Sequence, residues 1–247
     1  MADIVEAETV ANTMLDIVKR QEGSTGIPDY SKLINQGVVP DQLSTGAIHF
    51  HETNKTDIAK VCCELYQESP ESSRVMAPTK VLVSEINKLI QQAVNSSSDN
   101  LEFEINGDKF FLPLRLNDAV LFTQNHYDKS IQNGSLGTLT SVKPFGDKYG
   151  EVILDTGDKV EVTQSILDCM ELGYVITFHK AQGSQFPRII IALQKKRRIV
   201  DRAWLYTATT RAEIELHIVD NRDNLKQNTE APSQSHKRNS YLKELLS

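Results

Sequence analysis

A cluster of polar and basic residues follows a short apolar run near residue 177. The segment TFHKAQGSQF (177–186) combines hydroxyl, imidazole, ammonium and amide side chains with small residues: Thr177, His179, Lys180, Gln182, Gly183 and Ser184. Small residues leave backbone N–H groups accessible, and hydroxyl and basic side chains beside them favour contacts with phosphate oxygens. The pattern therefore indicates a phosphate-contacting segment, although a histidine between apolar residues is also common in a purely structural role.

Two arginines elsewhere in the chain could also meet an anion. Arg211 lies in TATTRA (207–212), just inside a predicted helix and among small residues, where an arginine can stabilise the charge that develops in phosphoryl transfer. The alternative is a solvated or ion-paired side chain, because charged residues usually lie on the surface. Arg20 and Lys19 end another predicted helix, and their favourable interaction with its macrodipole is a sufficient structural reason for both.

The elements that position these residues show two kinds of periodicity. Apolar residues recur at helical spacing in 10–19, 57–67 and 79–94. The expected apolar face of the last helix consists of Val83, Ile86, Leu89, Ile90 and Val94. Strand-like runs are expected at 74–78, 173–178, 188–193 and 215–220, with a further helix at 203–212. Strands alternating with helices predict an α/β domain with a parallel sheet.

The middle of the chain has a different pattern. Residues 118–164 contain short β-rich runs separated by turns with Gly or Asp, which is typical of a small antiparallel barrel. This barrel is expected to be inserted into the parallel-sheet domain. Near the end, QNTEAPSQSHKRN (227–239) indicates a polar linker, and SYLKELLS (240–247) a final helix.

Composition narrows the class of protein. The 247 residues include 27 Lys and Arg against 33 Asp and Glu, a net charge of −6, which argues against sequence-independent coating of nucleic acid but allows a basic groove. No run approaches the ~18–20 apolar residues of a membrane span, and no secretory signal is recognisable. Three cysteines without a CxxC pair predict buried reduced thiols, no metal site and a cytoplasmic location.

Five blocks in order resemble the C-terminal half of a superfamily 1 DNA helicase of the RecD type, the exodeoxyribonuclease V alpha subunit family of DNA repair and recombination. The blocks are LDIVKRQEGS (15–24), RVMAPTKVLVSEINKLIQ (74–91), NDAVLFTQNHYDKSIQNGSLGTL (117–139), GYVITFHKAQGSQFP (173–187) and WLYTATTRAEIELHIV (204–219). The resemblance spans roughly residues 14 to 246. It implies a RecA-like parallel-sheet domain formed by 1–113 and 166–222, an inserted Src-homology-3-like (SH3-like) β-barrel at 114–165, and a C-terminal linker and helix at 223–247.

The resemblance also implies roles for individual residues. Arg20 matches an arginine that contacts the ATP γ-phosphate, and Arg211 matches the arginine finger; both would be catalytic. Gln21, Gly183, Ser184 and Gln185 would face the nucleotide, with Gln185 standing where the family usually has Glu. The positions expected to hold single-stranded DNA are Thr79, Lys80, Asn125, Thr177, His179 and Lys180.

Two elements of an ATP site do not occur in this sequence. It contains no GxxxxGK[ST] phosphate loop and no Asp-Glu pair ending an apolar strand. In the family both belong to a first RecA-like domain, so ATP and Mg²⁺ are expected to be bound mainly by that domain, in cis or in trans. The chain is therefore not expected to hydrolyse ATP alone.

Two functions remain open on this basis, beside a third possibility, a fragment or gene-split product with no autonomous role. The chain could be the second half of an ATP-dependent DNA helicase that closes over ATP and grips single-stranded DNA. It could instead be a non-catalytic DNA-binding or interaction module derived from a helicase, which the missing loop and Gln185 would suit. Retention of both arginines favours the motor.

Overall fold

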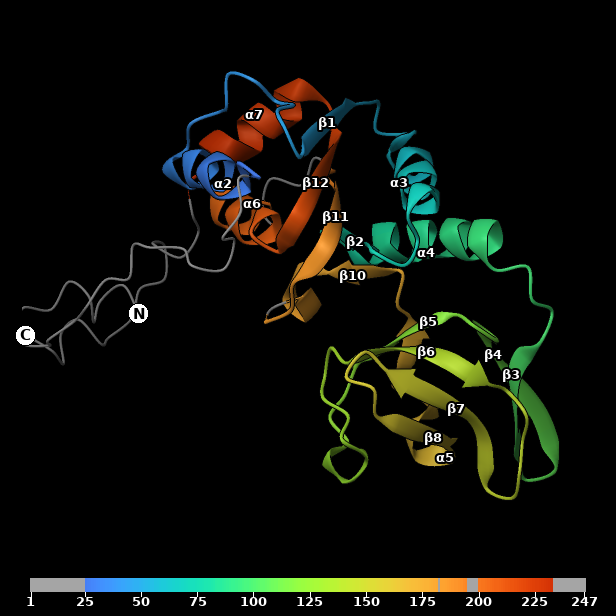
Figure 1. The fold of residues 1–247 in the computed structure, drawn as a ribbon. Helices are drawn as coiled ribbons and strands as arrows, with labels where there is room; N and C mark the ends of the chain where they lie inside the picture. The colour runs from blue at the N-terminus through green and yellow to red at the C-terminus, as the bar shows by residue number, and fades with distance from the viewer. Residues whose placement is uncertain (1–24, 182, 195–199, 233–247) are drawn as a thin grey trace, which may run out of the picture.

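The protein is built around a five-stranded sheet whose neighbouring strands are all parallel. The computed structural model describes residues 25–181, 183–194 and 200–232. The order in the sheet is β1-β12-β11-β2-β10 (Figure 1). The strands are β1 (Ile48–Glu52), β2 (Ser73–Ala77), β10 (Val175–Thr177), β11 (Phe186–Ala192) and β12 (Ala212–Asp220). The expected α/β fold with a parallel sheet is confirmed.

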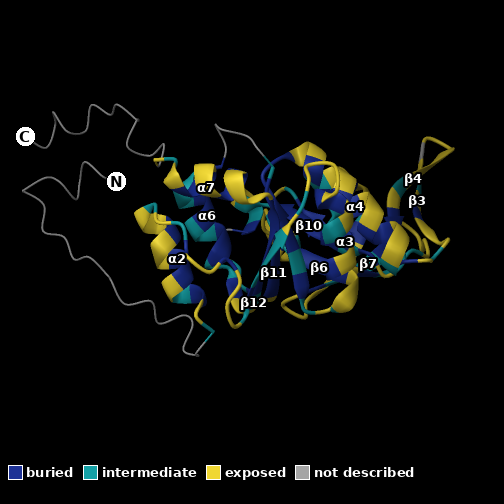
Figure 2. Ribbon diagram, turned by 90° about the horizontal axis from the view of Figure 1, so that it is seen from above, coloured by how far each residue is buried: buried dark blue, intermediate teal, exposed yellow. Residues whose placement is uncertain are grey.

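Helices cover both faces of this sheet. On one face lie α3 (Ile58–Glu68) and α4 (Lys80–Val94), and on the other α2 (Ile27–Gln36), α6 (Arg202–Thr209) and α7 (Arg222–Glu230). Successive residues of a strand point to opposite faces, so in β11 Ile190 joins the α3–α4 core while Ile189 and Ile191 join the other core. The apolar run of β11 is therefore buried on both sides, as is usual for central parallel strands. Figure 2 shows the strands largely buried between helices with exposed outer surfaces.

A second, antiparallel sheet is inserted between α4 and β10. Its order is β8-β7-β6-β5-β9, and its own apolar core includes Phe122, Ile131 and Val152. The strands are β5 (Ala119–Phe122), β6 (Leu136–Ser141), β7 (Lys148–Leu154), β8 (Lys159–Thr163) and β9 (Met170–Leu172), with α5 (Gln164–Leu167) between the last two. Because β9 pairs with β5, this sheet extends to Leu172, beyond the boundary expected at residue 165.

Several elements were not expected from the sequence. They are α2, β1, and the hairpin of β3 (Asn100–Ile105) and β4 (Asp108–Arg115), together with α7 and two short 3₁₀ helices, η1 (Tyr127–Lys129) and η2 (Phe178–Ala181). The expected linker from residue 227 was wrong at its start, because α7 continues to Glu230 and is capped by the side chain of Asn221. The helices expected at 10–19 and 240–247 lie outside the described residues.

The buried face of α4 differs from the expected apolar stripe. Leu89 is 37% exposed, whereas the polar side chains of Asn87 and Gln91 are buried. Asn87 Nδ2 donates to the carbonyl oxygens of Leu172 and Val175, and Gln91 Nε2 donates to that of Pro113. The helix thus packs against backbone at the junction of the two sheets, and hydrogen-bonding side chains are needed there. In the described part of the chain, no helix is long and apolar enough to cross a membrane.

Candidate functional site

The residues expected to hold DNA come together at the carboxyl ends of two neighbouring strands. β10 pairs with β2 in parallel, with Thr177 opposite Ala77, so both strands end at the same edge of the sheet. Thr79 and Lys80 follow β2, while His179 and Lys180 lie in η2 directly after β10. Segments about a hundred residues apart in sequence therefore meet at one place.

Three of these residues line one groove. Lys80, Thr177 and Lys180 border a hollow of about 410 Å³ between α4, β9, β10 and the second sheet. Its walls include the apolar side chains of Leu121 and Met170. The groove also has a third basic group, which lies eight residues after Lys80 on the same helix: Lys88. The sequence analysis missed Lys88, although the two-turn helical spacing was a usable signal.

Among the described residues, two of the three basic groups around this groove form no ion pair. Lys80 and Lys88 are exposed, and Lys180 is ion-paired with Glu171 at 3.1 Å. A groove of this kind has an apolar floor and ammonium groups at its rim. It can bind a polymer that has an anionic backbone and bases or sugars with apolar faces.

The remaining DNA candidates have other environments. Thr79 is 9% exposed, and its hydroxyl caps α4 by accepting a hydrogen bond from the N–H of Leu82 at 3.3 Å. His179 is exposed, with its ring edge-on to Phe178 at 5.4 Å between centroids. Thr79 thus has a structural role that is independent of any ligand.

Asn125 lies in the loop after β5, where it holds the loop together. Its Oδ1 accepts from the N–H of Asn133 at 2.7 Å, and its Nδ2 donates to the hydroxyl of Tyr127 at 3.0 Å. Gly134, in the same loop, passes so close to η2 that a Cβ there would lie 3.1 Å from the carbonyl oxygen of Lys180. Its φ of +100° also favours glycine. The inserted sheet therefore contacts η2 through this loop.

The residues expected on the nucleotide side gather at the opposite edge of the parallel sheet. Phe186 of β11 stands opposite Ala212 of β12, so the residues just before each strand are neighbours. Arg211 Nη1 donates to the carbonyl oxygen of Ser184 at 3.0 Å, and Arg211 Nε donates to that of Thr207 at 3.2 Å. Arg211 was expected inside a helix, but α6 ends at Thr209; the chain must leave the helix there to enter β12.

A second hollow of about 760 Å³ opens at this edge. Ser184 and Gln185 line it together with Arg74, which the sequence analysis did not single out. Within the described residues, the buried Nε2 of Gln185 has no hydrogen-bond partner. Gly183, with φ of +90°, makes the turn that precedes these residues. Arg20 and Gln21 lie outside the described residues.

An ionisable cluster lies on β1, β11 and β12, apart from both hollows. His49, Glu215 and His217 approach one another there, beside Arg188 and His51. Burial and, to a lesser degree, the guanidinium of Arg188 lower the pKa of His217 to about 4, so this imidazole is neutral at pH 7. Burial also lowers the pKa of His51. No metal site was expected from the sequence, because it has no CxxC pair and no Cys/His spacing typical of zinc sites.

The three cysteines have no chemical role in these sites. Cys62, Cys63 and Cys169 are buried and free, and burial raises the pKa of each thiol. Thiols in such surroundings are unreactive, which agrees with the expected buried reduced cysteines.

Comparisons with known proteins identify relatives for part of this chain. Residues 172–219 match the UvrD-like helicase C-terminal domain. The ATP-dependent RecD2 DNA helicase of Deinococcus radiodurans is 37% identical over 99 residues, which is 40% of this chain and 13% of that protein. The RecBCD enzyme subunit RecD of Mycobacterium tuberculosis is 30% identical over 117 residues, 47% of this chain and 20% of that protein. The chain thus matches a fifth or less of the length of these relatives.

Solved structures extend the likeness to nearly the whole chain. Pif1 helicase from Bacteroides in complex with ADP-AlF3 and ssDNA has a TM-score of 0.57 and 20% identity, over 91% of this chain and 55% of that one. Pif1 helicase from Candida albicans has a TM-score of 0.55 and 16% identity, over 93% and 59%. At these identities the likeness shows a shared fold. Together with the matched domain and relatives, it confirms the resemblance that the sequence blocks indicated.

Proposed function

We propose that this chain, a relative of the C-terminal half of RecD-type superfamily 1 DNA helicases, forms the second RecA-like half of an ATP-driven DNA motor. In this proposal the RecA-like domain is formed by the residues up to 113 and by 173–230, which include α7, and the segment between them, through Leu172, forms an SH3-like barrel. The observation that carries the proposal is the parallel register of β2 and β10, which brings Lys80, Thr177 and Lys180 into one groove.

The groove is proposed to grip single-stranded DNA. Lys80, Lys88 and Lys180 would contact backbone phosphates, with the Thr177 hydroxyl as an additional donor. His179 and Asn125 would contact the strand at the groove's outer side, while Thr79 would act by holding the first turn of α4. Glu171, whose side chain is 58% exposed, would give up its ion pair with Lys180, and a phosphate would replace it as the partner of the ammonium group.

The opposite edge is proposed to face ATP held with Mg²⁺ by a P-loop domain in cis or in trans. Bound ATP would supply the free energy for the motor step. The side chains fit this part because Arg211 is oriented by two carbonyl oxygens, and the amide nitrogen of Gln185 has no partner in the described chain. Arg211, with Arg20, would stabilise charge on the phosphoryl group, while Gln21, Gly183, Ser184 and Gln185 would contact the nucleotide.

Substitution of two groove lysines tests the DNA grip. Lys80→Ala/Lys180→Ala should weaken binding of a labelled single-stranded oligonucleotide roughly tenfold at low salt, measured by fluorescence anisotropy. Because two phosphate contacts are lost, the slope of log affinity against log salt should fall by about 1.4.

A matched pair supplies the control for this measurement. Lys60 on α3 and Lys226 on α7 are exposed lysines away from the groove, with side-chain exposures of 76% and 60%. Lys60→Ala/Lys226→Ala changes the net charge equally and should leave the affinity within about twofold. Equal weakening by both pairs would mean that net charge, and not the groove, attracts DNA.

The arginine-finger role of Arg211 is tested in the helicase reassembled with a P-loop-bearing domain. Arg211→Ala should lower the rate of ATP hydrolysis about 10³-fold or more, while ATP binding changes little. Arg222→Ala, an exposed arginine at the start of α7, serves as the control. Equal hydrolysis rates for Arg211→Ala and the parent would exclude Arg211 as the finger.

The second candidate function is a single-stranded-DNA-binding module without catalysis. The uncharged Gln185 at the nucleotide edge favours it, because the family usually has Glu there. Under this alternative the lysine substitutions would weaken DNA binding as above, but no P-loop domain would gain ATP hydrolysis from the chain. The two functions therefore separate in the reassembly experiment.

A further inference from the structure

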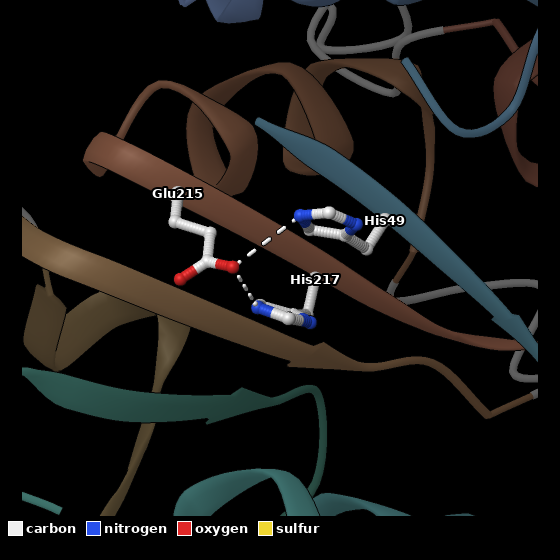
Figure 3. Close-up of side chains that lie close together, drawn as sticks. All are labelled: His49, Glu215 and His217. Atoms are coloured by element: carbon white, nitrogen blue, oxygen red, sulfur yellow. Dashed lines mark ion pairs between the residues drawn. The ribbon is translucent and has the colours of Figure 1, made fainter. Parts of the chain in front are cut away.

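The free edge of the parallel sheet carries a cluster of nitrogen and oxygen ligands. β1 is the edge strand and pairs in parallel with β12, with His49 directly opposite His217. Glu215 lies two residues before His217 on the same strand and thus points to the same face. Figure 3 shows the three side chains converging from the two strands.

Their donor atoms lie at distances that a metal ion requires. Glu215 Oε1 is 3.3 Å from His49 Nε2 and 3.1 Å from His217 Nε2, and all three atoms lie within 4.8 Å of one another. Around a tetrahedral zinc ion with ligands at about 2.0–2.2 Å, neighbouring ligand atoms are about 3.3–3.5 Å apart. Two of the three distances between ligand atoms in the cluster are therefore close to those around a zinc ion.

We propose that His49, Glu215 and His217 bind a divalent transition metal ion, zinc being the best match, and that the bound ion fastens the edge strand β1 to β12. Two imidazoles and one carboxylate form a ligand set that suits zinc better than magnesium or calcium, which prefer oxygen ligands. The site does not depend on the proposed helicase function.

Residues behind the ligands hold them in place. His51 Nε2 lies 2.9 Å from His217 Nδ1, so one hydrogen bond between the rings sets the orientation of His217 and leaves Nε2 turned toward Glu215. Arg188 Nε lies 3.0 Å from Glu215 Oε2 and fixes the oxygen that does not face the histidines. Metal-binding imidazoles and carboxylates are usually supported in this way.

Access to the site comes from the side of β1. The side chains of His49 and Glu215 are 41% and 35% exposed, whereas His217 is 5% exposed. An ion can therefore enter from solvent, and a water molecule can complete its coordination on the exposed side. His217 forms the inner wall.

Arg188 is the group that competes with the metal. Its Nε also lies 3.0 Å from His217 Nε2 and donates to the lone pair that the ion would use. Its charge is balanced by Glu68, 2.6 Å from Nη2, as well as by Glu215. On metal binding, Arg188 would keep Glu68 and the outer oxygen of Glu215 and lose only the contact with His217.

Zinc binding to the full chain at pH 7.5 tests the site, measured by competition with a chromogenic chelator. One zinc ion per chain is expected, and cobalt(II) in its place should give the strong visible absorption of a four-coordinate ion. His49→Ala/His217→Ala should weaken zinc binding at least about 100-fold, and His51→Ala about tenfold. The matched control His126→Ala/His179→Ala removes two histidines outside the cluster and should leave binding unchanged.

The effect of zinc on thermal unfolding is a second measurement, which tests the site with single substitutions if the double variant folds poorly. Glu215→Gln keeps the size of the side chain, and zinc should raise the Tm of the parent chain but not of Glu215→Gln or of the single variant His49→Ala. No bound zinc in the parent chain would overturn the proposal. So would zinc binding that survives His49→Ala/His217→Ala or is lost equally in the control pair.

Discussion

Two buried carboxylates, one at the junction of the two sheets and one at the end of β12, have very different surroundings. Asp118 is fully buried and accepts hydrogen bonds from four donors: Gln91 Nε2, Asn95 Nδ2, the backbone N–H of Arg115 and the hydroxyl of Tyr174, at 2.5–2.7 Å. Asp220 is 3% exposed, and among side chains both of its oxygens accept from the same group, Asn224 Nδ2, at 2.9 and 2.7 Å.

The two carboxylates therefore have different structural roles. The donors to Asp118 come from α4, the end of β4 and the residue before β10, so this one side chain joins the inserted sheet to the parallel-sheet domain. Gln91 and the nearby Pro113 also line the groove between the sheets, so Asp118 holds the walls of the proposed DNA site. Several good hydrogen bonds offset the cost of burying its charge.

Asp220 has too few donors for its degree of burial. Burial raises its pKa to about 6, and the hydrogen bonds from the Asn224 side chain and the Asn221 backbone only partly oppose this. Among the described residues, the nearby Asn224 Oδ1, Asn228 Nδ2 and Thr229 Oγ1 are buried without hydrogen-bond partners. The comparison teaches that a buried carboxylate with many donors can link separate elements of the fold, whereas at Asp220 the effect of burial exceeds that of the hydrogen bonds and raises the pKa.

The largest effect is expected for Asp118→Ala. It leaves four buried donors without an acceptor and should lower the free energy of unfolding by about 3–5 kcal/mol, measured by urea denaturation. It should also weaken binding of single-stranded DNA, because the groove walls lose their connection. Asp118→Asn, which keeps one acceptor oxygen, should cost clearly less. A loss below about 1 kcal/mol for Asp118→Ala would show that Asp118 does not hold the inserted sheet to the parallel-sheet domain.

An intermediate effect, and one that depends on pH, is expected for Asp220→Asn. The pKa of Asp220 is raised from 3.8 when unfolded to about 6 when folded, so between these values the folded state binds more protons. Stability from this group is therefore present at low pH and is lost as the pH rises from about 4 to about 6, by at most about 1.4 kcal/mol per pH unit.

Asp220→Asn should abolish that loss, since an amide does not ionise and can donate to Asn224 Oδ1. The free energy of unfolding of the variant, minus that of the parent, should increase between pH 4 and pH 7 and then become constant. Taking this difference removes the contributions of other titrating groups. A difference that is flat or falls over this range would contradict the role given to Asp220.

The smallest effect is expected for Tyr174→Phe. It removes one of the four donors to Asp118 and keeps the ring that packs edge-on against Tyr66 at 5.7 Å between centroids. The loss in the free energy of unfolding should be about 1 kcal/mol, since three donors remain. Urea denaturation of Tyr174→Phe and Asp118→Ala side by side shows whether the four hydrogen bonds contribute comparably to the free energy of unfolding. A loss as large as that of Asp118→Ala would mean that the hydrogen bond from the Tyr174 hydroxyl accounts for the whole stabilising effect of Asp118.

Much of the fold could be predicted because its signals are local. The run RIIIAL at 188–193 needs two covered faces, and the stripe in 79–94 needs a helix that begins near its capping threonine, Thr79. Elements with weak local signals were missed. β1 is a short edge strand of only five residues that contains two histidines, and α7 is polar apart from Leu225.

The candidate sites divide in the same way. Residue types and spacing indicated Thr177, Lys180, Ser184 and Arg211 as groups that could contact phosphate, and the family resemblance added Lys80. Only the tertiary structure separated them into two edges of one sheet, because the chain crosses from the carboxyl edge to the amino edge between β10 and β11. Only it added Arg74, whose neighbours are far away in sequence, whereas Lys88 lies on the same helix as Lys80 and could have been found from the helical spacing.

The amino-acid sequence by itself determined the alternation of strands and helices, the parallel sheet and the inserted β-rich segment, since side-chain periodicity follows directly from the geometry of each element. The tertiary structure decided which strands are neighbours and in what register. That register places Thr177 beside Ala77, and His49 beside His217. Such pairings join residues separated by about a hundred positions or more, and they depend on how the two cores pack together, which no local pattern of residues encodes.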